Sequence, residues 1–292
     1  MKRQAGITSA SSALTDRYQG GERSVLSGDG QSEANLRENA GPPRINERHY
    51  NAESEYEYGS RAGFWRLFRM FNKYDMKFTL YAVAQAVEQV PEVVTRCVET
   101  GHDVASHAYR WLEYHDFGIE KEKEWIKKCV ESLKKLSGYA PKGWYYGRGS
   151  PHSRTLIPQV YEEMGEELIW ASDTYADDIP YWIDRADQKD KGCLMVPYSY
   201  DCNDFKAFFN HLKNAFDVLY AEGEEGMPKM MTIGLHNRII GRPGRFKALQ
   251  DFVEYISTKE GVWVATRTEI AECFREQFPY KSGCLAEAKV SS

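Results

Sequence analysis

The chain has 292 residues, which suits one large α/β domain or two small ones. Its 38 lysines and arginines are outnumbered by 43 aspartates and glutamates, and no basic cluster is present, so the composition disfavours a nucleic-acid-binding protein. No apolar run approaches the roughly 18 residues of a transmembrane helix, and the N-terminus lacks the apolar core of a secretory signal. The six cysteines are scattered without a CxxC pair, which is typical of thiols in a reducing compartment. We therefore expect a cytoplasmic protein that binds neither nucleic acid nor membrane.

Three parts are expected along the chain: an irregular N-terminal segment (1–19), one folded domain (20–280) and a disordered tail (281–292). The predicted elements in chain order are helix 61–74, strand 76–83, helix 91–100, strand 103–106, helix 120–136, strand 143–146, helix 153–164, strand 168–171, strand 194–197, helix 207–221, strand 230–235, helix 242–258, strand 262–265 and helix 267–277. Strands that alternate with helices over short connections predict a parallel sheet, either open or closed into a barrel.

Charged or titratable residues follow five of the predicted strands. In chain order they are His107, Arg148, Asp173, the group Asp201, Asn203 and Asp204, and His236, which precedes Arg238. Ligand sites of parallel α/β folds lie at the C-terminal ends of the strands. We therefore predict a catalytic site made of His107, Arg148, Asp173 and His236.

Each of these residues also has a structural interpretation. A lone histidine is as often structural as catalytic, Asp173 could cap a turn, and Arg148 could only pair with a carboxylate. As a set, however, two histidines, an arginine and carboxylates suit hydrolysis of an amide. An imidazole can protonate the leaving nitrogen, a carboxylate can activate water or orient the imidazole, and Arg148 can stabilise the oxyanion. No G-x-S-x-G elbow or Cys-His signature favours a covalent mechanism.

Six segments in order resemble the polysaccharide-deacetylase (NodB-homology) superfamily. They are "ESEYEYGSRAGFWRLFRMF", "GHDVASHAYRW", "GWYYGRGSPHSR", "SDTYADDIPYW", "AFDVLYAEG" and "IGLHNRIIGRPGR". Within it, the chain is similar to the allantoinase branch that opens the hydantoin ring without a metal, over about Gly20 to Tyr280. The resemblance implies an α/β fold, a deformed (β/α) barrel of the NodB type.

The resemblance also implies how the site is composed. In the metal-dependent deacetylases two histidines four residues apart and a carboxylate bind the metal, whereas here His107 is followed by Trp111, and His115 lies outside the spacing. A catalytic zinc needs three protein ligands, so no metal and no other cofactor is expected. The expected substrate-binding residues are Glu55, Glu57, Arg61, Trp111, Tyr146, Trp182 and Arg238.

Two departures from the branch are visible. Tyr18 and Gln19 stand where the branch has paired glutamates, and the residues before them lack an apolar run, which predicts a degraded first strand and the loss of an acid/base carboxylate. The loop after Lys206 is shorter than expected by roughly a dozen residues, the length of a functional loop.

The leading interpretation is hydrolysis of a carbon–nitrogen bond in the hydantoin ring of allantoin, giving allantoate, by metal-independent general acid/base catalysis in purine catabolism. One alternative is a metal-dependent deacetylase of N-acetylated sugars such as chitin or peptidoglycan. Another is an inactive homologue that acts as a binding partner. We expect a small-molecule substrate and a homo-oligomer.

Overall fold

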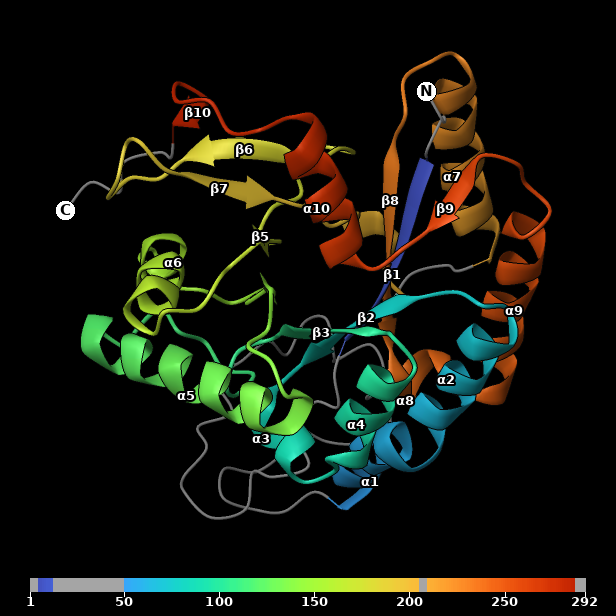
Figure 1. Ribbon diagram of the computed structural model, residues 1–292. Helices are drawn as coiled ribbons and strands as arrows, with labels where there is room; N and C mark the ends of the chain where they lie inside the picture. Colours follow the sequence, from blue (N-terminus) through green and yellow to red (C-terminus); the bar gives the residue numbers. More distant parts are fainter. Residues whose placement is uncertain (1–4, 13–49, 205–208, 287–292) are drawn as a thin grey trace.

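The computed structural model describes residues 5–12, 50–204 and 209–286. These residues form a mostly parallel sheet with helices around it (Figure 1). The strands are β1 (Ala5–Ser12), β2 (Phe78–Ala82), β3 (Asp103–Ser106), β4 (Gly143–Trp144), β5 (Trp170–Ala171), β6 (Tyr181–Asp184), β7 (Gly192–Met195), β8 (Met230–His236), β9 (Val262–Val264) and β10 (Leu285–Ala286). The helices are α1 (Tyr50–Tyr58), the π-helical turn η2 (Gly59–Gly63), α2 (Phe64–Lys73), α3 (Ala84–Glu88), α4 (Glu92–Glu99), α5 (Ile119–Ser137), α6 (Ser153–Glu163), the 3₁₀ turn η3 (Tyr200–Cys202), α7 (Phe209–Glu224), α8 (Asn237–Ile240), α9 (Pro243–Ile256) and α10 (Arg267–Gln277).

The strand order is β10-β6-β7-β5-β4-β3-β2-β1-β8, and β9 pairs with β1 beside this path. Every pairing is parallel except that of β6 with β7. Parallel strands separated by helices place their C-terminal ends at one edge, and this edge carries the predicted site.

The chain beyond β7 lies against β8, at the other end of the strand order. Asn203 forms a parallel bridge with Gly234, and the Asp204 N–H donates to the Gly234 carbonyl over 3.0 Å. The Met230 N–H donates in turn to the Asp178 carbonyl over 2.7 Å. These bonds place the segments after β5 and β7 beside β8, although no strand ladder joins β8 to the other end of the strand order in the described residues.

Arg267, the first residue of α10, enters the interior of the domain with a fully buried side chain. Its guanidinium donates to Thr232 Oγ1 over 2.7 Å, Ser172 Oγ over 2.6 Å and the Pro197 carbonyl over 2.9 Å. Thr232 belongs to β8, while Ser172 and Pro197 follow β5 and β7. One side chain therefore satisfies polar groups of β8 and of the segments after β5 and β7, as buried polar groups require.

Apolar side chains fill the space between the sheet and its helices. On α5, one face packs inward, because Ile126, Cys129, Val130 and Leu133 are all buried in the larger core cluster. Among the helices that the structure describes, none combines the length and the apolarity needed to cross a membrane.

Several local predictions differ from the structure. The N-terminal segment was expected to be irregular and the first strand degraded, yet Ala5–Ser12 forms β1 between β2 and β8. A central strand is held by backbone hydrogen bonds on both edges, so small residues suffice there. The tail was expected to be disordered from residue 281, but Leu285–Ala286 pairs with β6, and the Gly283 N–H donates to Asp184. The helix α1 and the strand β6 were not predicted. The domain boundaries stay a prediction, and Tyr18, Gln19 and Lys206 lie outside the described residues.

Candidate active site

The four predicted catalytic residues all lie at the C-terminal edge of the sheet. His107 directly follows β3, Arg148 comes four residues after β4, Asp173 comes two residues after β5, and His236 ends β8. Burial is the main cause of a lowered pKa of His107, and electrostatic interactions with His236 and Arg148 add to it, so these three side chains are close enough to interact.

The His107 imidazole is held by the strand beside it. Its Nδ1–H donates to the Tyr145 carbonyl over 2.8 Å, and its ring stacks on the Tyr145 ring with centroids 5.2 Å apart. Only 4% of the residue is exposed. Burial lowers the pKa of His107 to about 4, assisted by His236 and Arg148 and opposed by the hydrogen bond to Tyr145. The ring is therefore neutral near pH 7, and its lone pair lies on Nε2.

His236 is paired with Asp204, a carboxylate with no exposed surface. The backbone N–H and the Nδ1–H of His236 donate to the two carboxylate oxygens, each over 2.7 Å. Arg245 donates to the Asp204 carbonyl over 2.9 Å and fixes the backbone of the same residue. An imidazole held this way carries its proton on Nδ1 and its lone pair on Nε2, the form of a general base.

Asp204 was not among the predicted catalytic residues, although it had been noticed as one of several carboxylates after strand 194–197. The signal available was only its position past a strand. The bridge between Asn203 and Gly234 selects Asp204, because it places the chain after β7 beside the end of β8.

Arg148 lies on Trp111, the residue four positions after His107. The guanidinium carbon is 3.9 Å from the centre of the Trp111 ring, and Nη1 donates to Glu113 over 3.2 Å. The stacked ring and the carboxylate orient the cation by cation–π attraction and charge. The Arg148 side chain is 19% exposed, so it stays at the surface of the rim.

Asp173 holds the loop that carries Tyr145 and Arg148. Its carboxylate accepts hydrogen bonds from the Tyr146 N–H over 2.9 Å and the Gly147 N–H over 2.7 Å. Burial raises the pKa of Asp173, while these two backbone bonds lower it. The Asp173 carboxylate thus orients the loop, and the carboxylate that orients an imidazole is that of Asp204.

A cleft of about 210 Å³ opens beside Asp173. It is lined by Tyr146, Gly147, Gly149, Ser150, Ser153, Asp173 and Tyr175. His107 and His236 are not among these lining residues. The cleft therefore marks the side of the rim formed by the loops after β4 and β5.

The predicted substrate-binding residues fall into three places. Arg238 lies with its guanidinium 4.7 Å from the centre of the Tyr56 ring, and Arg61 pairs with Glu57 over 3.3 Å. Glu55 is an exposed residue of the same helix α1. Tyr146 is 2% exposed, with its ring packed against Tyr114 and Trp144 in the core. Trp182 contacts the end of the domain instead, since its indole N–H donates to the Phe278 carbonyl and its ring lies against Tyr280. The structure thus joins Trp111 to Arg148 and groups the α1–α8 residues, but it separates Trp182 from them.

The comparisons with known proteins concern the family and the fold. Residues 53–169 match the family model named polysaccharide deacetylase. A Schizosaccharomyces pombe protein named "Putative polysaccharide deacetylase" is 45% identical over 296 residues, covering 94% of this chain and 92% of the relative. Two solved structures, a probable polysaccharide deacetylase from Pseudomonas aeruginosa and Puue allantoinase, are each 40% identical with a TM-score of 0.81, covering 96% of this chain and 93% of theirs.

This likeness extends over nearly the whole chain and confirms the NodB-type fold predicted from the sequence. The chain therefore belongs to the polysaccharide deacetylase family and is a hydrolase of the superfamily that joins these deacetylases with allantoinase.

Proposed function

We propose that this hydrolase opens the hydantoin ring of allantoin to give allantoate, without a metal at the His107 site. The observation that carries the proposal is the stacking of Arg148 on Trp111, four residues after His107. The 40% identity to a structure named allantoinase supports the same substrate. We propose further that the enzyme acts in purine catabolism in the cytoplasm and forms a homo-oligomer.

The residues at this position do not fit a divalent cation. A catalytic zinc takes three protein ligands, and an indole supplies none. A guanidinium cation covers the Trp111 ring that stands in place of the second histidine. A cation beside the site would repel a metal ion. No step of the proposed reaction therefore passes through a metal at this position.

The His236–Asp204 pair supplies the base. As water attacks a ring carbonyl, Nε2 of His236 takes its proton, and Asp204 stabilises the resulting imidazolium. The new carbon–oxygen bond leaves a negative charge on the carbonyl oxygen, which the Arg148 guanidinium stabilises. The carbon–nitrogen bond then breaks, and the leaving nitrogen takes the proton back from His236. The carboxylic acid formed ionises to the carboxylate of allantoate.

His107 has a different role in this reaction. Its low pKa, about 4, makes the imidazolium scarce at neutral pH, so it is a poor proton donor. Its neutral Nε2 instead accepts a hydrogen bond from an N–H of the ring and orients the substrate. Asp173 positions the loop that carries Arg148.

The direct test is hydrolysis of racemic allantoin by the purified chain, with and without a chelator. We expect turnover that survives chelation and is abolished by His236→Ala. Turnover lost on chelation would overturn the metal-free mechanism. A folded sample that is inactive on allantoin would overturn the substrate assignment.

The second candidate function is deacetylation of N-acetylated sugars, which the names of the family model and of two relatives favour. Release of acetate from chitin oligomers or peptidoglycan, lost on chelation, would establish it.

An inactive homologue is the third candidate, and its test is Gln19→Glu together with a restored loop after Lys206. An inactive parent that this variant does not reactivate would support the inactive homologue, and turnover by the parent itself would exclude it.

A further inference from the structure

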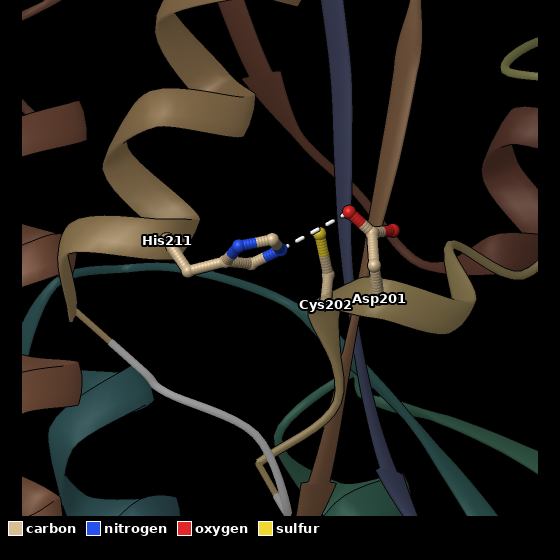
Figure 2. A group of neighbouring side chains, drawn as sticks. All are labelled: Asp201, Cys202 and His211. Atoms are coloured by element: carbon tan, nitrogen blue, oxygen red, sulfur yellow. Dashed lines mark hydrogen bonds and ion pairs between the residues drawn. The ribbon is translucent and has the colours of Figure 1, made fainter.

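Three side chains of different ligand chemistry converge away from His107, where η3 meets the first turn of α7. Asp201 and Cys202 are neighbours in η3, and His211 is the third residue of α7. Each supplies one ligand atom, and the three atoms lie within 4.8 Å of one another. Figure 2 shows the three side chains directed at a common point, with His211 Nε2 and Asp201 Oδ2 3.0 Å apart.

We propose that Asp201, Cys202 and His211 bind a divalent cation of the zinc class. A thiolate, an imidazole and a carboxylate together suit Zn²⁺ better than the hard cations Mg²⁺ and Ca²⁺. Bond lengths of about 2.0–2.3 Å place the ligand atoms of a tetrahedral zinc roughly 3.5 Å apart. The observed spacing reaches this by side-chain shifts of about 1 Å. On binding, the Cys202 thiol releases its proton to water.

Accessibility and burial at the three residues suit ion binding. The Asp201 and His211 side chains are 59% and 41% exposed, so an ion can enter and keep water as its remaining ligand. Cys202 is 2% exposed, which holds its sulfur on the protein side of the site. A surface ion pair between histidine and aspartate would need no thiol within reach, so the third group distinguishes a ligand set from an ordinary pair.

The surrounding charge also favours a cation. Burial raises the pKa of Asp178, and the negative charges of Asp177, Glu222 and Asp201 add to the rise, while Lys229 lowers it. Lys229 is itself 3.5 Å from Glu222. Asp201 is thus within electrostatic reach of Asp178, where the acidic groups outnumber Lys229, and this balance of charge favours a cation.

The ion would be coupled to the active site through the backbone. Asp204 lies two residues after Cys202 and holds His236 by two hydrogen bonds. Contraction of the ligands around an ion pulls η3 toward α7 and draws Asp204 away from β8. We expect Zn²⁺ to lower turnover by weakening the His236–Asp204 pair, a consequence that rests on the proposed function.

The test of binding uses Co²⁺ as a spectroscopic probe on the full chain. We expect one equivalent of Co²⁺ to give a thiolate charge-transfer band, which Zn²⁺ abolishes by displacing Co²⁺. Cys202→Ser should remove the band, and His211→Ala, a surface change that leaves the core intact, should weaken Co²⁺ affinity by roughly tenfold or more, since even partners that only orient metal ligands are worth this much. Cys273→Ser is the matched control, because it removes a thiol elsewhere and should leave the band unchanged.

Absence of the band in the folded wild-type chain, or its persistence in Cys202→Ser, would overturn the site. The coupling is measured separately, as the fraction of allantoin turnover that Zn²⁺ inhibits in the wild type and in His211→Ala, each relative to its own basal rate. Equal inhibition in both would overturn the coupling. If allantoin is not a substrate, the Co²⁺ band still decides whether the metal site exists.

Discussion

Replacing Asp204 with asparagine tests the proposed base. The carboxylate is fully buried and accepts two bonds of 2.7 Å from His236, one from the backbone N–H and one from Nδ1–H. Asparagine has one acceptor oxygen, so when it serves the backbone, its NH₂ group faces Nδ1. That contact favours the tautomer with a proton on Nε2, the atom that must take a proton from water.

The loss should therefore approach the whole contribution of a general base, about 10²- to 10⁴-fold in kcat. At 1.36 kcal/mol for each factor of ten, this corresponds to about 3–5 kcal/mol of transition-state stabilisation. The assay is steady-state hydrolysis of allantoin, with urea unfolding to verify that the variant is folded. Asp190→Asn, at an exposed aspartate, is the matched control. A folded Asp204→Asn enzyme whose kcat remains close to that of the wild type would refute the assignment of His236 as the base.

Three further predictions concern His107, Arg267 and Gly147. Because burial lowers the pKa of His107 to about 4 from about 6.5 in the unfolded chain, the unfolded state binds more protons between these values. The free energy of unfolding should fall by up to about 3 kcal/mol as the pH drops through this range, and His107→Gln should flatten the slope in urea titrations; an unchanged slope would contradict the low pKa. Arg267→Met leaves buried acceptors unpaired and should cost about 3 kcal/mol or more of unfolding free energy. Arg96→Met, at an exposed arginine, should cost little. Equal losses in the two variants would refute the role of Arg267 in joining β8 to the segments after β5 and β7. Gly147 has φ +69°, and an added Cβ would lie 3.1 Å from the Tyr145 hydroxyl oxygen. Gly147→Ala should therefore cost about 1–2 kcal/mol of unfolding free energy and lower kcat by moving Arg148. An unaltered kcat would show that the loop does not position the guanidinium of Arg148.

Elements whose pattern is local could be predicted from the sequence. The strand Asp103–Ser106 and the helix Arg267–Gln277 have the predicted bounds. Thr266 is the N-cap of this helix, and its side chain forms a capping box with that of Glu269. This signal depends only on residues three apart. The placement of titratable residues at strand ends is predictable for the same reason, since it needs only the positions of the strands.

What depends on tertiary pairing could not be predicted in this way. The small residues of β1 carry no apolar signal, because the ladders to β2 and β8 hold the strand. Likewise, Asp173 and Asp204 both follow strands, and nothing local distinguishes their roles. The Asp173 carboxylate accepts a hydrogen bond from the backbone of the loop after β4. The Asp204 carboxylate bonds His236 because Asn203 pairs with Gly234 of β8.

The two histidines of the rim show how one site can separate two chemical roles. His107 is buried against Tyr145, bonded to a carbonyl and exposed to the positive charge of Arg148, and all but the carbonyl bond disfavour its charged form. His236 instead donates through Nδ1 to the buried Asp204 carboxylate, which orients its ring. The proposed reaction therefore assigns the base to the carboxylate-bonded His236 and substrate orientation to the neutral His107. Burial is the main cause of the low pKa of His107, and Arg148, which stacks on Trp111, adds to it. In the proposed mechanism, the tryptophan four residues after His107 therefore has two consequences: it offers no metal ligand, and it holds the arginine assigned to the oxyanion.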